Sequence, residues 1–220
     1  MAEELLPEPL PSNPLPLFAK WLSEARDRRV QPNPDAMALA TVDAQCRPSA
    51  RVVLCKRFSV EDGFVVFFTN FNSRKGRDLV QHPRAAAVFH WDALHRQVRI
   101  EGPVLKSPDS ESNEYFASRP LHSRIGAWAS EQSEPLPSRA ALLEQVRAAA
   151  AKFNVASDAD QGHVPRPPQW GGHRLWIESI ELWSEGDSRI HDRALWTRAL
   201  IASEAGGFTA GEWRATRLNP

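Results

Sequence analysis

The sequence predicts a mainly β protein with peripheral helices, an α+β chain whose strands form an antiparallel barrel or sandwich. The main indication is a series of short segments rich in β-branched and aromatic residues, joined by short turns. A second is that helical spacing of apolar residues is largely confined to a segment before these strands and to two segments after them. The length of 220 residues favours one domain with its own core.

The chain is expected to begin with a loose segment over residues 1–14, which are rich in proline and acidic residues, followed by a single domain over residues 15–220. A helix is predicted from Pro16 to Arg28, because four apolar residues form a stripe on one face: Leu17, Trp21, Leu22 and Ala25. The prolines between Gln31 and Pro34 end it.

The central part of the sequence predicts five strands, and turn residues separate the first three. The predicted strands cover residues 36–42, 49–56, 63–69, 85–91 and 98–105. Helices are predicted over residues 108–130 and 136–153, before a loop over 154–172. Three closing strands are predicted near residues 173–182, 189–197 and 212–218.

The composition limits the possible partners and the cellular compartment. Lys plus Arg and Asp plus Glu both number 27, so a net charge of zero argues against nucleic acid or an acidic membrane surface. Cys46 and Cys55 have neither metal-site nor redox-motif spacing, and we interpret both as buried free thiols. The sequence has no signal-peptide pattern and no apolar run of membrane-spanning length. We therefore expect a soluble, cytoplasmic protein.

The first candidate site is the turn Ser73-Arg74-Lys75-Gly76. Ser73 is a predicted N-cap for a helix ending near Gln81, and a helix N-terminus with free N–H groups attracts anions. Two cations in the first turn oppose the helix dipole, and a bound dianion would compensate for them. A phosphate cradle is therefore favoured slightly over a solvated basic surface.

The second candidate site lies at the end of a predicted helix, from Tyr115 to Ser123. Tyr115 and Arg119 are four residues apart and share a helical face, while Ser123 follows the break at Pro120. A tyrosine, an arginine and a serine directed at one point suit a monophosphate. Taken alone, however, this segment favours the alternative of a solvent-facing arginine beside an unrelated tyrosine.

The third candidate site runs from Trp183 to Arg193. In a strand, alternate residues share a face, so Arg189, His191 and Arg193 are predicted on one side. Three such groups repel unless an anion or an aromatic ring lies across them, and Trp183 could supply an aromatic wall. The alternative is an edge strand that uses charge to resist pairing. We favour a site, because Ile190 gives the opposite face an apolar contact.

Several motifs are absent from the sequence: a dinucleotide or Walker-type glycine loop, a nucleophile elbow, paired carboxylates and a His/Cys metal cluster. Three basic clusters in a neutral chain predict small phosphorylated ligands. Two phosphates would account for the clusters, and the chemistry would then come from a cofactor.

Seven motifs, in order over residues 15–198, resemble the pyridoxine/pyridoxamine 5′-phosphate oxidase family: Arg51–Lys56, Phe68–Lys75, Arg96–Val98, Tyr115–Pro120, Ile125–Ser133, Trp170–Gly172 and Arg189–Arg193. The resemblance implies a split-barrel homodimer with FMN at the subunit interface. It also implies oxidation of pyridoxine or pyridoxamine 5′-phosphate to pyridoxal 5′-phosphate, with O2 as the acceptor and H2O2 as a product. Two alternatives stay open: a related flavin oxidase of phenazine biosynthesis and a flavin-binding protein without turnover.

The resemblance also implies residue roles. Residues that would border FMN are Arg51, Lys56, Phe68, Thr69, Arg74, Lys75, Gln97, Gln132, Ser133, Trp183 and Arg193. Residues that would hold the substrate phosphate are Lys56, Tyr115, Arg119 and Ser123, while Arg189 and His191 would lie over the substrate ring as the catalytic pair. Phe68 stands where the family commonly has tyrosine. Arg51 and Lys56 are an odd number of residues apart, so an ideal strand would direct them to opposite faces.

Overall fold

The computed structural model describes residues 5–156, 159–204 and 206–220. Its α-helices are α1 (Leu15–Asp27), α2 (Arg74–Gln81), α3 (Asp109–Ser118), α4 (Leu121–Ala129) and α5 (Arg139–Lys152). Its strands are β1 (Ala36–Val42), β2 (Pro48–Leu54), β3 (Arg57–Ser59), β4 (Phe64–Asn70), β5 (Arg84–Trp91), β6 (Arg96–Lys106), β7 (Trp170–Trp176), β8 (Ser179–Ser184), β9 (Asp192–Thr197), β10 (Leu200–Ala202), β11 (Phe208–Ala210) and β12 (Arg214–Leu218). Two short 3₁₀ turns, Asp92–Leu94 and Asp187–Arg189, precede β6 and β9.

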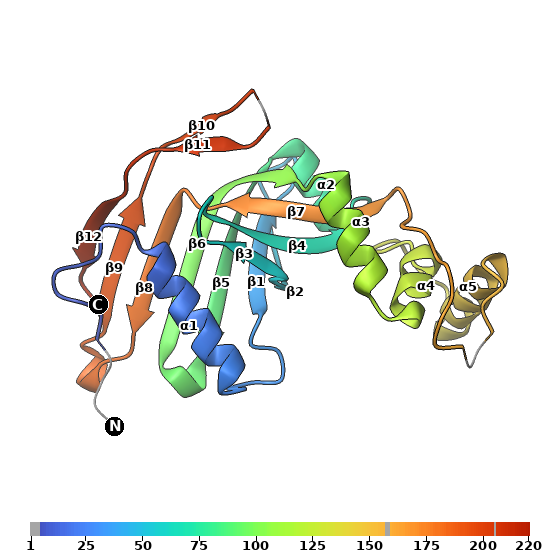
Figure 1. Ribbon diagram of the computed structural model, residues 1–220, viewed down its shortest axis with the longest axis horizontal. Helices are drawn as coiled ribbons and strands as arrows, with labels where there is room; N and C mark the ends of the chain where they lie inside the picture. The colour runs from blue at the N-terminus through green and yellow to red at the C-terminus, as the bar shows by residue number, and fades with distance from the viewer. Residues whose placement is uncertain (1–4, 157–158, 205) are drawn as a thin grey trace.

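The main sheet is antiparallel and has two limbs that share strand β6 (Figure 1). One limb has the order β12-β9-β8-β6-β5-β1-β2, and the other joins β6 to β7, β4 and β3. The first half of β6 pairs with β8 through Glu101, and its end pairs with β7 from Val104 onward. Gly102 lies between these two parts, where an added Cβ would be 1.9 Å from the Trp176 carbonyl oxygen. The strand can therefore serve both limbs only with glycine at this point.

Helix α1 covers the first limb (Figure 1) and builds the main core. Its buried side chains are Leu15, Phe18, Trp21, Leu22 and Ala25, which extend the predicted stripe. The Phe18 ring lies 4.5 Å from the Phe58 ring and 5.2 Å from the Phe89 ring, between centroids. Helices α4 and α5 pack on one another in a separate cluster away from this core.

The described part of the N-terminal segment differs from the loose segment expected. Leu6 is buried, and its N–H donates to the Asp192 carboxylate at 2.8 Å. The Pro11 carbonyl oxygen accepts a hydrogen bond from the Trp196 indole at 2.8 Å. Residues 5–14 are thus held against β9, because they satisfy buried polar groups there. Residues 1–4 lie outside the described residues.

Three of the predicted elements need correction. The predicted helix over 108–130 is two helices, because Pro120 holds the preceding Arg119 in an extended conformation. The predicted strand over 173–182 is divided into β7 and β8, each with different partners. The predicted strand over 189–197 begins only at Asp192, since the preceding residues form a 3₁₀ turn. The short strand β3 was not predicted.

Two further observations bear on the sequence predictions. Cys55 is buried as expected, whereas Cys46 is exposed in a turn with a φ of 60°, so the prediction for Cys46 was wrong. Among the described residues, no helix combines the length and the apolar character that crossing a bilayer requires.

Phe18→Ala should lower the free energy of unfolding by about 3–5 kcal/mol, because it removes a fully buried ring that joins α1 to the sheet. Urea unfolding followed by circular dichroism measures this loss. Val80→Ala is the matched control, since Val80 is 68% exposed and should change the free energy by less than about 0.5 kcal/mol. A loss below about 1 kcal/mol for Phe18→Ala would contradict the assigned role of α1.

Candidate functional site

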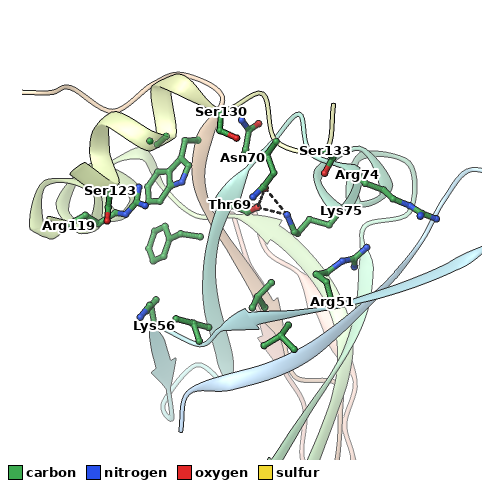
Figure 2. A pocket seen from close by; sticks show the side chains of 18 of the residues that line it. Arg51, Lys56, Thr69, Asn70, Arg74, Lys75, Arg119, Ser123, Ser130 and Ser133 are labelled. Atoms are coloured by element: carbon green, nitrogen blue, oxygen red, sulfur yellow. Dashed lines mark hydrogen bonds between the residues drawn. The ribbon is translucent and has the colours of Figure 1, made fainter. Parts of the chain in front are cut away.

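The largest group of predicted site residues lines one cavity of about 780 Å³ (Figure 2). Strands β2 and β4 form one side, and α2, α3 and α4 contribute the others. Eleven predicted residues meet here: Arg51, Lys56, Phe68, Thr69, Arg74, Lys75, Tyr115, Arg119, Ser123, Gln132 and Ser133. The lining includes five cationic side chains among them and, within the described part of the chain, no carboxylate. The cavity is therefore suited to an anionic ligand.

The cationic side chains lie in two groups within the cavity. In Figure 2, Arg51, Arg74 and Lys75 lie toward one side, while Lys56 and Arg119 lie toward the other. A ligand with a single anionic substituent could contact only one of these two sets of cations. The arrangement therefore favours two separate anionic groups in the same cavity.

The first group surrounds the start of α2. Ser73 is the N-cap, as predicted, and its Oγ accepts from the Gly76 N–H at 3.4 Å. An added Cβ at Gly76 would lie 2.0 Å from the Phe71 carbonyl oxygen, so the preceding turn packs directly on the helix. Lys75, the neighbour of Gly76, is buried. Its Nζ donates to Thr69 Oγ1 at 2.7 Å, Ser73 Oγ at 3.0 Å and Gln132 Oε1 at 2.9 Å.

Positive charge is poorly balanced in this group. Burial is the main cause that lowers the pKa of Lys75 to about 8, and the Arg51 charge lowers it further. Burial also lowers the pKa of Arg51, with Arg74 adding to the effect, while Asp78 opposes it. The Asp78 carboxylate lies 3.7 Å from the Arg51 guanidinium and accepts from Thr41 Oγ1 at 2.6 Å. Asp78 offsets the charge of Arg51 and Lys75 only in part, so an anion bound beside Arg51, Arg74 and Lys75 would stabilise all three.

The second group lies where α3 ends and α4 begins. The Arg119 guanidinium carbon lies 4.8 Å from the centre of the Trp170 ring, and burial lowers the pKa of Arg119. Its Nη1 is buried and has no hydrogen-bond partner among the described residues. An unpaired buried donor on a cation is costly, which indicates a missing acceptor. The solvent-facing alternative for Arg119 is therefore wrong.

Aromatic rings and a break in a strand shape the space between the two groups. The Phe68 ring stacks on the Tyr115 ring at 4.0 Å and on the Trp170 ring at 5.4 Å, between centroids.

Strand β2 ends before Lys56, whose N–H instead donates to the Val66 carbonyl oxygen. The odd separation from Arg51 is resolved in this way, because Lys56 no longer follows the strand alternation.

The remaining predicted residues form a second group on the other end of the molecule (Figure 1). Gln97 on β6 pairs in register with Trp183 on β8, and Trp183 pairs with Arg193 on β9. The His191 ring lies 4.8 Å from the Trp183 ring, between centroids. Arg189 and His191 line a separate cavity of about 630 Å³. Within one chain, the structure does not bring this group to the first cavity.

The predicted common strand face of Arg189, His191 and Arg193 was wrong. Arg189 belongs to the 3₁₀ turn and has a φ of 66°, so alternation does not apply to it. Arg193 is held by the Glu181 carboxylate at 3.0 Å and the Asn219 carbonyl oxygen at 3.0 Å. The edge-strand alternative is wrong as well, because β9 pairs with both β8 and β12.

Sequence reasoning did not assign three residues that contribute to the site: Trp170, Asp78 and Thr41. Trp170 lies within the Trp-Gly-Gly motif and could have been found there, since the ring stacks under Arg119. Asp78 and Thr41 are brought together by the packing of α2 on β1, and no local sequence pattern indicates their contact.

Two family models match the chain. Residues 24–153 match the model described as pyridoxamine 5′-phosphate oxidase. Residues 170–220 match the one described as the pyridoxine 5′-phosphate oxidase C-terminal dimerisation region. The second model includes four of the five residues of the second group: Trp183, Arg189, His191 and Arg193.

Similar proteins agree with these matches. The pyridoxine/pyridoxamine 5′-phosphate oxidase of Burkholderia mallei is 50% identical over 208 residues, covering 94% of this chain and 89% of that protein. The structure of PhzG from Burkholderia lata, in complex with tetrahydrophenazine-1-carboxylic acid, is 30% identical with a TM-score of 0.80, covering 96% and 94%. An FMN-binding protein from Nostoc punctiforme, related to pyridoxamine 5′-phosphate oxidase, shares the fold at 16% identity with a TM-score of 0.65, covering 93% and 96%.

Proposed function

Because the chain belongs to the pyridoxamine 5′-phosphate oxidase family and has its antiparallel split-barrel fold, we propose that it is an FMN-dependent oxidase. Its substrate is pyridoxine 5′-phosphate or pyridoxamine 5′-phosphate, and its products are pyridoxal 5′-phosphate and H2O2. The observation that supports this most strongly is the pair of separated cationic groups in one cavity. One group suits the phosphate of a cofactor and the other the phosphate of a substrate.

The start of α2 fits the phosphate of FMN. It offers the helix N-terminus, the buried Lys75 ammonium and the Arg51 and Arg74 guanidinium groups, without a carboxylate in the described lining. Thr69 and Gln132 accept hydrogen bonds from Lys75, and Ser133 follows Gln132 and lines the same cavity. Burial, and to a lesser degree the Arg51 charge, lowers the pKa of Lys75 to about 8, and a bound phosphate would favour its charged form.

The junction of α3 and α4 fits the substrate phosphate. Arg119 offers a buried N–H without a partner among the described residues, while Lys56, Tyr115 and Ser123 line the same part of the cavity. The stacked rings of Phe68, Tyr115 and Trp170 form an apolar wall next to it. A phosphate joined to a small aromatic ring matches this combination of charge and apolar surface.

The second group requires a second subunit. We propose a homodimer in which Gln97, Trp183 and Arg193 of one subunit complete the FMN site of the other, with Arg189 and His191 over the substrate ring. The match to a dimerisation region supports this arrangement. Strand β2 supports it too, because among the described strands it pairs with β1 alone and leaves Val52 68% exposed at the mouth of the first cavity.

The chemistry is divided between the cofactor and the protein. When bound, FMN supplies two-electron oxidation of the substrate's C4′ carbon, with O2 as the final acceptor. The protein binds both phosphates, and its stacked rings limit the positions open to the substrate. Arg189 and His191 orient the substrate ring from the partner side.

A second candidate function is supported by the match to PhzG, a protein whose structure contains tetrahydrophenazine-1-carboxylic acid. A flavin oxidase acting on a phenazine-type ring would use the same FMN site. It would not need the phosphate-binding set at the α3–α4 junction. The buried donor of Arg119, unpaired within the described residues, therefore favours the phosphorylated vitamin.

The purified protein should be yellow, release FMN on heating, and oxidise pyridoxine 5′-phosphate with production of H2O2. Absorbance, chromatography of the released flavin and an oxygen-electrode assay measure these properties. A protein that binds FMN but oxidises only a dihydrophenazine would support the second candidate. A protein that fails to bind added FMN would remove both.

FMN affinity should fall as the pH rises above about 8, by up to about tenfold per unit, because Lys75 has a pKa of about 8 in the empty site. The phosphate is dianionic throughout this range and favours the protonated lysine, so binding takes up a proton above that pH. Flavin fluorescence titrations at pH 7 to 9.5 measure the effect. The Lys75→Gln variant should bind FMN more weakly at pH 7, and its affinity should not fall further above pH 8. A pH-independent affinity in the unsubstituted protein would contradict the assignment.

Arg119→Ala should lower kcat/KM for pyridoxine 5′-phosphate by about 10- to 100-fold, since a hydrogen bond to a charged group contributes about 1.5–3 kcal/mol. Turnover of unphosphorylated pyridoxine should change little. Arg147→Ala is the control, because Arg147 is an exposed arginine on α5. Equal losses of kcat/KM on the two substrates would show that Arg119 does not bind the substrate phosphate.

A further inference from the structure

The segment between β8 and β9, residues 185–191, carries Arg189 and His191, which we propose to lie over the substrate ring. The role inferred here for this segment rests on the proposed oxidase function. Its conformation is unusual, because Ser188 and Arg189 have consecutive positive φ angles of 53° and 66° without a glycine at either position. Such a backbone persists only where surrounding contacts determine it. The contacts that hold this segment therefore decide where Arg189 and His191 lie.

The first of these contacts anchors the beginning of the segment. The Glu185 N–H donates to the His95 carbonyl oxygen at 2.9 Å, and the Glu185 carboxylate pairs with His95 Nδ1 at 2.5 Å. His95 lies in the turn before β6 and is itself left-handed, with a φ of 54°. The segment is thus fixed to the main sheet on one side.

The second contact closes the segment on itself. An added Cβ at Gly186 would lie 1.9 Å from the Ile190 carbonyl oxygen. The backbone of Gly186 is extended, with φ −122° and ψ 158°, so any residue could adopt it. Glycine is needed here for the close approach and not for its φ. This approach brings the Gly186 N–H to 3.3 Å from His191 Nδ1.

The direction of that hydrogen bond determines the state of the imidazole. A backbone N–H can only donate, so Nδ1 of His191 is an acceptor and carries no hydrogen. A neutral imidazole with an acceptor Nδ1 has its hydrogen on Nε2. The Trp183 ring, 4.8 Å away between centroids, packs against the imidazole in this orientation.

We propose that Gly186 is a positioning residue that fixes His191 as the Nε2–H tautomer. His191 then donates a hydrogen bond through Nε2 to an oxygen or nitrogen acceptor of the substrate. It does not remove a proton from the substrate, because Nε2 already holds a hydrogen and Nδ1 is occupied by Gly186.

Two substitutions of His191 separate a donor from a base. A glutamine side chain could place an amide N–H near the Nε2 position, so His191→Gln should lower kcat/KM for pyridoxine 5′-phosphate by less than about threefold. His191→Asn, with a shorter side chain, should lower it by about tenfold. A general base contributes about 10²–10⁴-fold, so both variants would then lose about 100-fold or more, and that result would overturn the proposal.

The tautomer can be measured without turnover, in the flavin-loaded full chain at pH 8. Two-bond ¹H–¹⁵N spectra of protein labelled at its seven histidines distinguish Nδ1–H from Nε2–H, and the His191 signal is the one that His191→Gln removes. We expect the Nε2–H pattern. An Nδ1–H pattern, or two equivalent nitrogens, would overturn the proposal even if the oxidase activity is present. If no oxidase activity is found, this spectrum still decides the tautomer.

Gly186→Ala tests the positioning role. We expect it to retain yellow colour and folded circular dichroism, to lose the fixed Nε2–H pattern, and to lower kcat/KM about as much as His191→Asn. Gly211→Ala is the matched control, because an added Cβ there meets its nearest atom at 3.6 Å, an ordinary contact. An unchanged His191 pattern in Gly186→Ala would refute the role of Gly186.

Discussion

The bend of strand β6 at Gly102 is the constraint on which the rest of the structure depends. One part of the strand holds β8, and the other holds β7, which in turn holds β4. Gln97 therefore belongs to one limb of the sheet, while Thr69 on β4 belongs to the other. The structure does not bring these two residues together within one chain. If both border one FMN, as we propose, the site must be shared between two subunits, which agrees with the match to a dimerisation region.

Charge is distributed unevenly over the molecule. The whole chain has a formal net charge of zero, yet one cavity collects cations without a carboxylate in its described lining. Carboxylates form ion pairs outside this cavity; Glu181, for example, pairs with Arg99 and Arg193. A neutral protein can thus present a strong local field to a small phosphorylated ligand while offering little attraction to a polyanion.

Local signals made much of the fold predictable. The Ser73 cap and the apolar stripe of α1 each depend on residues close in sequence, and both elements were predicted within about one residue of their observed ends. The cavity residues could be predicted because they came as ordered motifs. The break between β7 and β8 was not predictable, since contacts with different, distant strands impose it. The left-handed pair Ser188 and Arg189 was not predictable either, since neither residue is a glycine and the contact of Glu185 with His95 comes from a distant turn.

Asp192 joins parts of the chain that are far apart in sequence. Its carboxylate accepts from the Leu6 N–H and from the Arg217 guanidinium, and Arg217 also pairs with Glu8. Asp192 lies between His191 and Arg193, so one acidic group connects an early segment and the last strand to two residues that we propose for the partner's active site. On that proposal, limited proteolysis near either segment would weaken FMN binding. An affinity tag that displaces Glu8 or Arg217 would act in the same way.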